Sequence, residues 1–479
     1  MSIHFIPGLF FLSLFLASPV QLQAQQAHPT SSAYQWPQDP QVKEKLEQWQ
    51  DQKFGMIIHW GLYAVPGIIE SWSICSEDWI TRDSTSVYSE YKDWYWGLKE
   101  KFNPQKFDPE QWAQAARDAG MRYVVFTTKH HDGFNMFDTQ QTDFKISDGP
   151  FADHPKANVA KHVFDAFRQQ GFMVGAYFSK PDWHSEYYWW PLYATPNRNN
   201  NYDIRQHPWR WNQFKSFTFR QIGELMHDYG SIDILWLDGG WVRPRETVTE
   251  EVLSWGAPIP EWSQDIDMPH IARMAREAQP GLLIVDRTVH GPYENYQTPE
   301  QQIPEQRLNH PWESCITLGN NWGYVPGDTF KSATKVIHSL IEIVAKGGSL
   351  LLGVGPQPDG TLSQPQVERL TQIGSWMKAN GKAIYSTRSV EEYQDGTTFF
   401  TRGKEGALYA LACLPEGEPV PETIRWKGPQ PSEGAQALLL STGEPVSWQI
   451  QEGEVIVTVP ASFRNKAASY PALAFSFQK

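Results

Sequence analysis

Asp238 follows an almost continuous apolar run at residues 232–237 and precedes two glycines, Gly239 and Gly240. Such a run is typical of a buried parallel strand, so its end places the carboxylate at the mouth of a sheet. The glycines allow a substrate to approach the backbone there. A carboxylate in this position serves as a nucleophile or a metal ligand. The simpler alternative is that Asp238 caps the next helix or turn.

Three histidines end two other strand-like runs. His59 ends the run that starts at residue 54, and His130 and His131 follow the run at 123–128. Histidines that converge on one face of a sheet bind hydroxyl groups or a metal ion. Successive residues of a strand point to opposite sides, so His130 and His131 both face a site only if the strand ends before them. The alternative is a set of hydrogen-bonded core histidines.

A second carboxyl group is needed for acid–base chemistry, and Glu300 is the candidate. It lies in a loop, thirteen positions beyond Arg287, which ends the apolar run that begins at residue 282. Two facing carboxyl groups, one ionised and one protonated, are what the cleavage of a glycosidic bond requires. Because the chain holds 54 acidic residues, many pairs arise by chance, and the rivals by position are Glu70, Glu294, Glu305 and Glu313.

The elements that must position these residues alternate strand-like runs with amphipathic helices from about residue 50 to 385. Six clear strands are expected at 54–60, 123–128, 172–178, 232–238, 282–286 and 349–354, and two weaker ones near 313–317 and 383–385. The alternation predicts an α/β fold, a (β/α)8-like TIM barrel whose reactive groups lie at the C-terminal ends of the strands. An open doubly wound sheet is less favoured, since no G-x-G-x-x-G segment follows the first strand.

After about residue 390 the pattern changes to short strand-like runs without helices, spaced about ten residues apart. This spacing predicts a small C-terminal antiparallel β-sandwich. The N-terminal 24 residues carry no Lys, Arg, Asp or Glu and contain an apolar run at 9–17, as a secretory signal cleaved near Ala24 does. We therefore expect a signal peptide at 1–24, a catalytic barrel at 25–388 and a β-sandwich at 389–479, in a soluble protein that is exported to the periplasm or secreted.

Composition narrows the class of protein. The 479 residues include 41 basic and 54 acidic ones, so the formal charge is −13, which argues against nucleic acid as a partner. The 22 Trp and 19 Tyr suit a protein that handles carbohydrate, because flat aromatic faces pack on sugar rings; the alternative is a core filled with large rings. Cys75, Cys315 and Cys413 lie far apart without metal-ligand spacing, so neither a zinc site nor a disulfide framework is expected.

Four segments resemble, in family order, those of glycoside hydrolase family 29, the α-L-fucosidases. They are F-G-M-I-I-H-W-G at 54–61, T-K-H-H-D-G-F at 128–134, L-W-L-D-G-G at 235–240 and K-G-G-S-L-L-L-G-V-G-P at 346–356. The resemblance covers about residues 40–390. It implies an exo-acting, retaining α-L-fucosidase that needs no cofactor or metal, acts on fucosylated oligosaccharides or glycoconjugates, and has a (β/α)8-like barrel followed by a β-sandwich.

The resemblance also implies the roles of individual residues. The family's nucleophile falls on Asp238, and the segment Q-T-P-E at 297–300 is similar to the one that carries the acid/base in many members, which places that role on Glu300. The family's fucose pocket falls on His59, His130, His131, Trp236 and Arg287, with Glu70 and Trp72.

Three other functions compete with this interpretation. One is a protein that binds fucose or a glycan without catalysis, and another is a related retaining glycosidase with a different sugar specificity. The third is a metal-dependent hydrolase built on His59, His130 and His131. A hydrolysis assay with a nitrophenyl α-L-fucoside separates the first, and the effect of a chelator separates the third.

Overall fold

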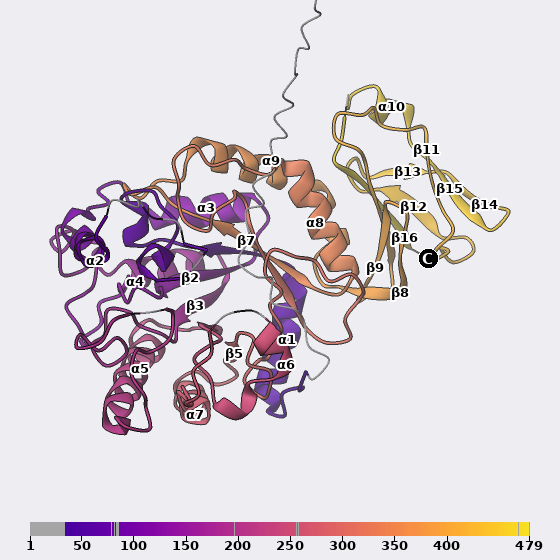
Figure 1. Cartoon of the computed structure of the whole chain (residues 1–479). Helices are drawn as coiled ribbons and strands as arrows, with labels where there is room; N and C mark the ends of the chain where they lie inside the picture. The colour runs from indigo at the N-terminus through magenta and orange to yellow at the C-terminus, as the bar shows by residue number, and fades with distance from the viewer. Residues whose placement is uncertain are drawn as a thin grey trace, which may run out of the picture.

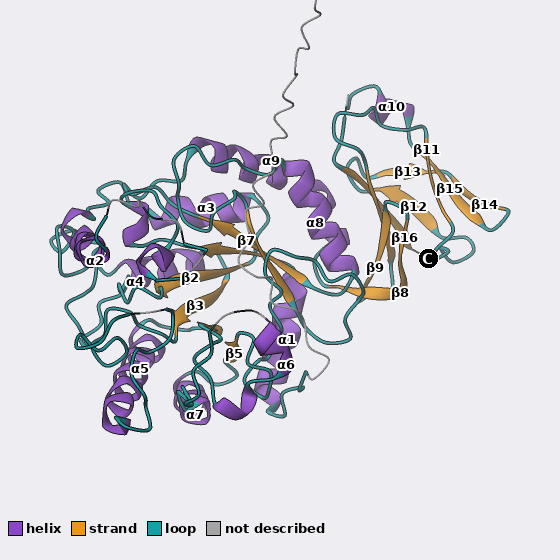
Figure 2. Ribbon diagram, in the orientation of Figure 1, coloured by secondary structure: helices purple, strands orange, loops and turns teal. Residues whose placement is uncertain are grey.

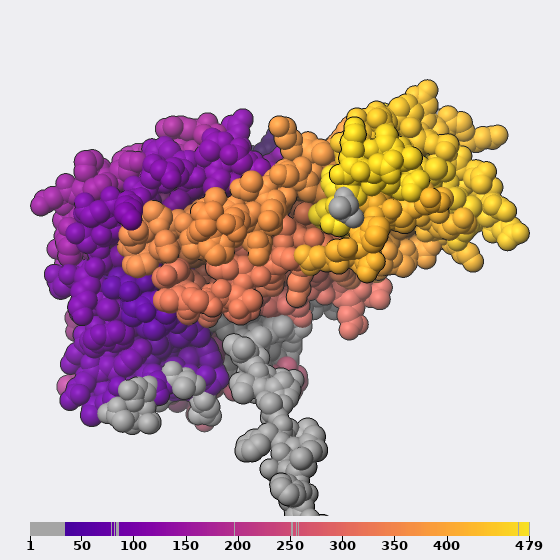
Figure 3. Space-filling view, turned by 90° about the horizontal axis from the view of Figure 1, so that it is seen from above, coloured from indigo at the N-terminus to yellow at the C-terminus, as the bar shows by residue number. Residues whose placement is uncertain are grey.

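The computed structural model describes residues 34–77, 79–80, 82, 86–195, 197–254, 256, 258–467 and 469–478. The expected signal peptide at 1–24 lies outside these residues. A large body of parallel strands wrapped by helices is joined to a smaller lobe of antiparallel strands (Figures 1 and 2). Figure 3 shows this C-terminal lobe, in yellow, projecting from one side of the body. Among the described residues no helix is long and apolar enough to cross a membrane.

The body is built on a curled sheet of seven parallel strands in the order β5-β4-β3-β2-β1-β7-β6. Its strands are β1 (Phe54–Ile58), β2 (Tyr123–Lys129), β3 (Met173–Ser179), β4 (Ile234–Asp238), β5 (Leu283–Asp286), β6 (Glu313–Thr317) and β7 (Ser349–Val354). Nearly all of their residues are buried, and most are apolar, as is typical of parallel strands covered by helices. The predicted fold class, a (β/α)8-like barrel with a C-terminal β-sandwich, is confirmed.

The expected number of strands is wrong by one within the described residues. The weak strand near 313–317 is present as β6, but residues 381–383 form a short 3-10 helix and Ile384 keeps helical dihedral angles. This turn follows the long helix α9 (Gln364–Asn380) and directs the chain into the C-terminal lobe. A three-residue apolar stretch is too short to separate a strand from such a turn by its pattern.

The segment from Glu294 to Glu300 lies where the sheet is open, between β5 and β6. An isolated bridge pairs Glu294 with Val285 of β5. Two others pair Gln297 with Trp312, which directly precedes β6, and Glu300 with Cys315 of β6. The chain therefore closes the barrel with an irregular segment instead of an eighth strand. The bridge to Cys315 thereby holds Glu300 beside β6.

Helices cover the sheet, and one of them closes the N-terminal end of the barrel. They are α1 (Pro40–Gln52), α2 (Tyr88–Trp96), α3 (Pro109–Asp118), α4 (Val159–Gln169), α5 (Pro208–Asp228), α6 (Glu250–Ser254), α7 (Met268–Ala278), α8 (Ala333–Ala345) and α9 (Gln364–Asn380). Leu46 and Trp49 of α1 pack with Tyr123 and Tyr296 in the core cluster that fills the barrel. Since Tyr123 is the first residue of β2, α1 closes the N-terminal end of the barrel and leaves the C-terminal end for a site.

Local sequence explains where the helices begin and end. In α3, the Asp108 side chain accepts a hydrogen bond from the Gln111 N–H and Pro109 occupies the first position, as in a capped helix start. Trp112 and Ala116 face the core. Gly120 ends the helix with a φ of 86°, a conformation that favours glycine.

The C-terminal lobe consists of two antiparallel sheets, ordered β13-β12-β16-β10-β9-β8 and β11-β15-β14. The two sheets share a core that includes Phe400, Trp426, Val457 and Phe475. The elements are β8 (Thr387–Asp395), β9 (Thr398–Gly403), β10 (Leu408–Cys413), β11 (Thr423–Trp426), β12 (Gln436–Leu439), β13 (Glu444–Val446), β14 (Trp448–Gln451), β15 (Glu454–Thr458), α10 (Ala461–Arg464) and β16 (Ala472–Gln478).

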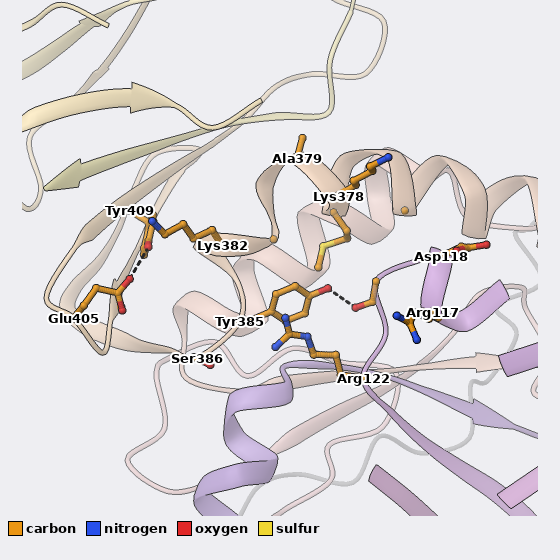
Figure 4. Close-up of a pocket in the computed structure, with 15 residues that line it drawn as sticks. Arg117, Asp118, Arg122, Lys378, Ala379, Lys382, Tyr385, Ser386, Glu405 and Tyr409 are labelled. Atoms are coloured by element: carbon orange, nitrogen blue, oxygen red, sulfur yellow. Dashed lines mark hydrogen bonds between the residues drawn. The ribbon is translucent and has the colours of Figure 1, made fainter. Parts of the chain in front are cut away.

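A pocket of about 750 Å³ lies at the seam between the body and the lobe (Figure 4). Arg122, which lines it, directly precedes β2, so the pocket is at the opposite end of the barrel from the strand C-termini. The Tyr385 ring lies under the Arg122 guanidinium, and its hydroxyl donates to the Gly120 carbonyl. The cations Arg117 and Lys378 in its wall belong to the last turns of α3 and α9, where the helix dipole favours positive charge. The pocket is thus a packing seam.

Candidate active site

The C-terminal ends of the strands bring the predicted residues together. His59 directly follows β1, His130 and His131 follow β2, Asp238 is the last residue of β4, and Arg287 follows β5. Strand β2 ends at Lys129, which satisfies the condition for both of its histidines to face the site. Their rings lie 4.3 Å apart between centroids. All of these residues are largely buried except Asp238, whose side chain keeps 17% of its surface exposed.

Asp238 is held by three hydrogen-bond donors. Its Oδ1 accepts from Arg287 Nη1 at 3.0 Å and from the Gly239 N–H at 2.8 Å, and its Oδ2 accepts from the Tyr177 hydroxyl at 2.8 Å. His131 Nε2 lies 3.8 Å from Oδ2. Burial by itself raises the pKa of Asp238, but Arg287, His131 and these hydrogen bonds outweigh it and hold the pKa well below its usual value. These contacts therefore favour the ionised carboxylate.

Arg287 connects the two carboxyl groups. While its Nη1 donates to Asp238, its Nη2 donates to Glu300 Oε2 at 2.8 Å and its Nε donates to Thr298 Oγ1 at 3.1 Å. The guanidinium lies over the Trp236 ring, 4.6 Å from its centroid. One planar fork thus places Asp238 and Glu300 beside each other, on the side of the barrel where the segment from Glu294 to Glu300 replaces a strand.

Glu300 is also held from its other side. Its Oε1 accepts a hydrogen bond from Trp322 Nε1 at 3.2 Å. The Trp322 ring in turn lies 4.9 Å from the His59 ring. The acid side chain, the indole and the histidine therefore form one continuous wall.

Burial keeps the three histidines neutral, and two of them, His130 and His131, each have one ring nitrogen bound to a serine. Ser71 Oγ lies 2.5 Å from His130 Nδ1, and Ser179 Oγ lies 2.8 Å from His131 Nδ1, which leaves both Nε2 atoms for other partners. Burial lowers the pKa of His130 to about 4, and burial followed by the charge of His130 lowers the pKa of His59 and of His131 well below the usual value. Neutral imidazoles can donate to or accept from sugar hydroxyls without adding charge.

His59 has an unused polar atom. Its Nδ1 is buried and makes no hydrogen bond within the part of the chain that is described. Buried polar atoms are nearly always paired, so an orphan at the mouth of a barrel indicates a partner supplied by a ligand.

Trp72 lies in the wall next to His131, and Glu70 is two residues before it in the chain. Trp72 belongs to a short 3-10 helix, Ser71–Ile74, that Glu70 precedes. Its ring lies 5.2 Å from the His131 ring and packs against Trp183 at 5.3 Å. Both Glu70 and Trp72 are buried.

Several residues of the site had no place in the sequence interpretation. Tyr177 and Ser179 end β3, and the rule that reactive groups follow strand ends points to them, because β3 was an expected strand. Ser71, which binds His130, and Trp322, which binds Glu300, come from long connections. Neither carries a pattern that separates it from the other polar and aromatic residues of those loops.

The site contains one arrangement with metal-ligand spacing among the described residues. His130, His131 and Asp238 offer ligand atoms within 4.8 Å of one another. His59, the third histidine of the metal-hydrolase hypothesis, is not part of the group. The Arg287 guanidinium already lies 3.0 Å from Asp238 Oδ1, so a cation bound there would face a fixed positive charge. The donor set fits an uncharged organic substrate better than a metal ion.

Comparison with known proteins identifies relatives over most of the chain. The model of the Alpha-L-fucosidase family matches residues 21–382. Plasma alpha-L-fucosidase of Homo sapiens is 28% identical over 444 residues, which cover 87% of this chain and 86% of that protein. Alpha-L-fucosidase of Dictyostelium discoideum is 26% identical over 423 residues, with 84% and 83% covered.

Solved structures show the same architecture. Alpha-L-fucosidase isoenzyme 1 from Paenibacillus thiaminolyticus superposes with a TM-score of 0.72 at 28% identity, covering 91% of this chain and 99% of that one. The Thermotoga maritima alpha-fucosidase in complex with fucose superposes with a TM-score of 0.69 at 25% identity, covering 93% and 100%.

Proposed function

The chain belongs to the α-L-fucosidase family, glycoside hydrolase family 29, and we propose that this retaining α-L-fucosidase uses Asp238 as its nucleophile and Glu300 as its acid/base. The observation that carries the assignment is the Arg287 guanidinium, which binds Asp238 at 3.0 Å and Glu300 at 2.8 Å. A retaining glycosidase needs its two carboxyl groups roughly 5–5.5 Å apart. One guanidinium group that binds both carboxyl groups holds them about as close together as this mechanism requires.

The first step transfers a terminal α-L-fucosyl group to the enzyme. Asp238 attacks the anomeric carbon, and protonated Glu300 gives its proton to the leaving oxygen, so that the aglycone departs as an alcohol. Asp238 suits this role because its donors keep it ionised and because its side chain is reachable from the mouth of the barrel.

The second step hydrolyses the fucosyl ester. Glu300, now a carboxylate, takes a proton from water, whose oxygen attacks the anomeric carbon and releases Asp238. The ester has no charge at Asp238 in this state, so Glu300 no longer faces a like-charged neighbour. Two inversions give a product with the α configuration of the substrate.

Recognition of fucose rests on the neutral histidines and the indole faces. His59, with its orphan Nδ1, and His130, with a free Nε2, are placed to bind hydroxyl groups. Trp72 offers a flat surface for the sugar and its C5 methyl group, and Trp236 supports the pocket from below through the Arg287 guanidinium that lies over its ring. A sugar that left such a buried polar atom unpaired would be rejected more strongly than one that merely lacked a methyl contact. We assign the remaining contacts of the pocket to His131, Arg287 and Glu70.

The test is hydrolysis of a nitrophenyl α-L-fucoside, followed by NMR of the first-formed fucose. We expect activity, release of the α-anomer, no loss of activity with a chelator, and much weaker activity on galactosides. An initial β-anomer would exclude the double displacement. Absence of any hydrolysis, with fucose still bound, would favour the glycan-binding protein instead.

We also propose the division of the chain into a catalytic barrel at 25–388 and a β-sandwich at 389–479, with an export signal at 1–24 that is cleaved near Ala24. The start of β8 at Thr387 and the uncharged apolar N-terminus support it. The substrates in this proposal are fucosylated glycans met outside the cytoplasm, such as those of glycoproteins. Sequencing of the N-terminus of the exported protein tests the cleavage.

A further inference from the structure

Glu313, the first residue of β6, is completely buried inside the barrel. Its Oε1 accepts a hydrogen bond from Trp236 Nε1 at 3.1 Å, and its Oε2 accepts one from the Tyr123 hydroxyl at 2.7 Å. Both oxygens are thus engaged by donors of the barrel interior, which separates Glu313 from the acid/base role for which it was a rival. Burial raises the pKa of Glu313 to about 7. A buried carboxyl group is costly, so its retention at this place calls for a function.

The indole that Glu313 holds lies directly below the reacting groups. Trp236 and Asp238 are two residues apart on β4, so their side chains share the inward face of the strand. The Arg287 guanidinium lies 4.6 Å from the centroid of the Trp236 ring, and the Tyr177 ring stacks on the same indole at 5.3 Å. Arg287 and Tyr177 are two of the three donors to Asp238. Both therefore rest on one indole.

We infer that Glu313 is a positioning residue of the fucosidase reaction: by fixing the Trp236 indole, it sets the places of Arg287 and Tyr177 against Asp238. The inference rests on the proposed roles of Asp238 and Glu300. The hydrogen bond from Trp236 Nε1 fixes the orientation of the indole ring. The plane of that ring then determines where the Arg287 guanidinium lies above it. Since Arg287 also holds Glu300, an error at Trp236 reaches both carboxyl groups.

The experiment compares Glu313→Leu with Glu313→Gln. Leucine has a similar volume and no acceptor, so we expect kcat on an aryl α-L-fucoside to fall by about 10²-fold, as small misplacements of reacting groups do, while KM changes by less than about 3-fold. Glutamine keeps an acceptor for Trp236 and donates to the Tyr123 oxygen, which can donate in turn to the Leu350 carbonyl, now 3.4 Å away. We expect glutamine to recover most of the lost kcat.

Tyr123→Phe is the matched control. It removes the hydrogen bond that Tyr123 donates to the same carboxyl group and leaves the one from Trp236 in place. We expect thermal stability to fall about as far as in Glu313→Leu, while kcat stays within about 3-fold of the wild type. If Glu313 had only a structural role, kcat would follow thermal stability, so it would fall in both variants or in neither.

Other outcomes are equally decisive. If Glu313→Leu folds and keeps the kcat of the wild type, the positioning role is wrong. Should the leucine variant fail to fold, Glu313→Asp replaces it, because the shorter side chain withdraws the acceptor from Trp236; a fall in kcat of at least about 10-fold supports the inference, and an unchanged kcat overturns it. The wild type is assayed first, since its inactivity would contradict the proposed function rather than the role of Glu313.

Discussion

The Arg287 guanidinium is the positive charge that the two carboxyl groups of the site share. Arg287 is nearly buried and faces two carboxyl groups, so ionisation of both would leave a net negative charge in a space of low dielectric. The donors around Asp238 keep that carboxyl group ionised. The proposed reaction takes its proton from Glu300, which binds the same guanidinium. Two carboxyl groups with different surroundings are what the proposed division of roles requires.

Removal of each carboxyl group should separate these roles. Glu300→Ala is expected to lower kcat on a natural fucoside by about 10²–10⁴-fold, because the leaving oxygen no longer receives a proton. On a dinitrophenyl fucoside, whose leaving group needs no proton, formation of the fucosyl ester should be nearly normal. Asp238→Ala should be strongly impaired on both substrates, because no ester can form. Steady-state and burst kinetics on the two substrates measure the difference.

Azide supplies the control for this pair of variants. In Glu300→Ala, azide attacks the fucosyl ester and gives an α-configured fucosyl azide after two inversions. In Asp238→Ala, azide enters the space of the missing carboxylate, attacks the substrate directly and gives the β-configured product. NMR distinguishes the two anomers, and the opposite pairing of products with variants would contradict the assignment.

The buried histidines make the fold sensitive to acid. The pKa of His130 is lowered by burial to about 4, whereas an unfolded histidine has a pKa of about 6.5. Between these values the unfolded chain binds more protons than the folded one, so the free energy of unfolding rises with pH from 4 to 6.5. His130→Gln should flatten this part of the stability curve, measured by urea unfolding at several pH values.

The comparison needs two safeguards. Burial raises the pKa of Asp132 to about 6 and that of Glu313 to about 7, and both act in the opposite direction over part of the range, so the difference between variant and wild type is the informative quantity. His227→Gln, which replaces an exposed histidine, is the control and should leave the slope unchanged. Parallel curves for wild type and His130→Gln would show that His130 is not buried in its neutral form.

At the scale of the elements, the turns that follow the strands place the reactive groups. Gly239 and Gly240 follow β4, and a Cβ atom added at Gly240 would overlap Thr288 Oγ1 and lie 3.0 Å from the Arg287 carbonyl oxygen. Thr288 already has a φ of 61°. The turn after β4 and the turn after β5 are therefore in direct contact, at the point where the backbone carries Asp238 and Arg287.

Gly240→Ala should consequently displace Arg287 from Asp238. We expect a fall in kcat of about 10-fold or more on an aryl fucoside, together with some loss of thermal stability, because the new methyl group has no room. Gly97→Ala is the control, since no atom lies within 4 Å of its added Cβ and its φ is −66°. Equal kcat values for both variants would mean that the two turns can separate without cost.

How far the sequence predicts these elements depends on how regular they are. The six clear strands and the residues that follow them were predictable because apolar runs that end in polar residues identify buried parallel strands. The segment from Glu294 to Glu300 has no such pattern, since isolated bridges and not a ladder hold it. Position in the chain made Glu300 one candidate among several glutamates, and the family resemblance favoured it over its rivals. Trp322 was unpredictable for a related reason: it reaches Glu300 from a loop whose path is set by tertiary packing.

At the scale of the whole molecule, the barrel and the C-terminal lobe share a core. The main core cluster of the body includes Phe399, Tyr409 and Leu411 from β9 and β10, so one face of the six-stranded sheet belongs to the barrel and the other to the sandwich. Helix α8 packs on β8 and β9. The sequence indicates where the lobe begins, through the loss of helical patterns, but it contains no signal for which face of these strands meets the barrel.

Hydrogen bonds between elements far apart in the sequence reinforce this junction. Trp376 Nε1 of α9 donates to the Ala472 carbonyl at 2.8 Å, and His338 Nε2 of α8 lies 2.7 Å from the Pro471 carbonyl. Lys404 pairs with Asp51 of α1 at 2.6 Å. The lobe thus contacts both α8, which precedes β7, and α9, which follows it. Strand β7 is in turn the neighbour of β1 in the sheet.

Truncation after residue 388 should therefore damage the barrel instead of releasing an independent domain. The shortened chain would expose apolar side chains of α8 and α9 that β9, β10 and β16 now cover, and large exposed apolar patches promote aggregation. We expect little soluble protein and a melting temperature well below that of the full chain. Trp448 lies in the outer sheet and packs on Phe477, away from the barrel. Trp448→Ala should therefore destabilise the lobe locally while kcat stays close to the wild-type value. A soluble, active truncation with an unchanged melting temperature would show that the barrel needs no support from the lobe, and that the shared apolar face is tolerated in water.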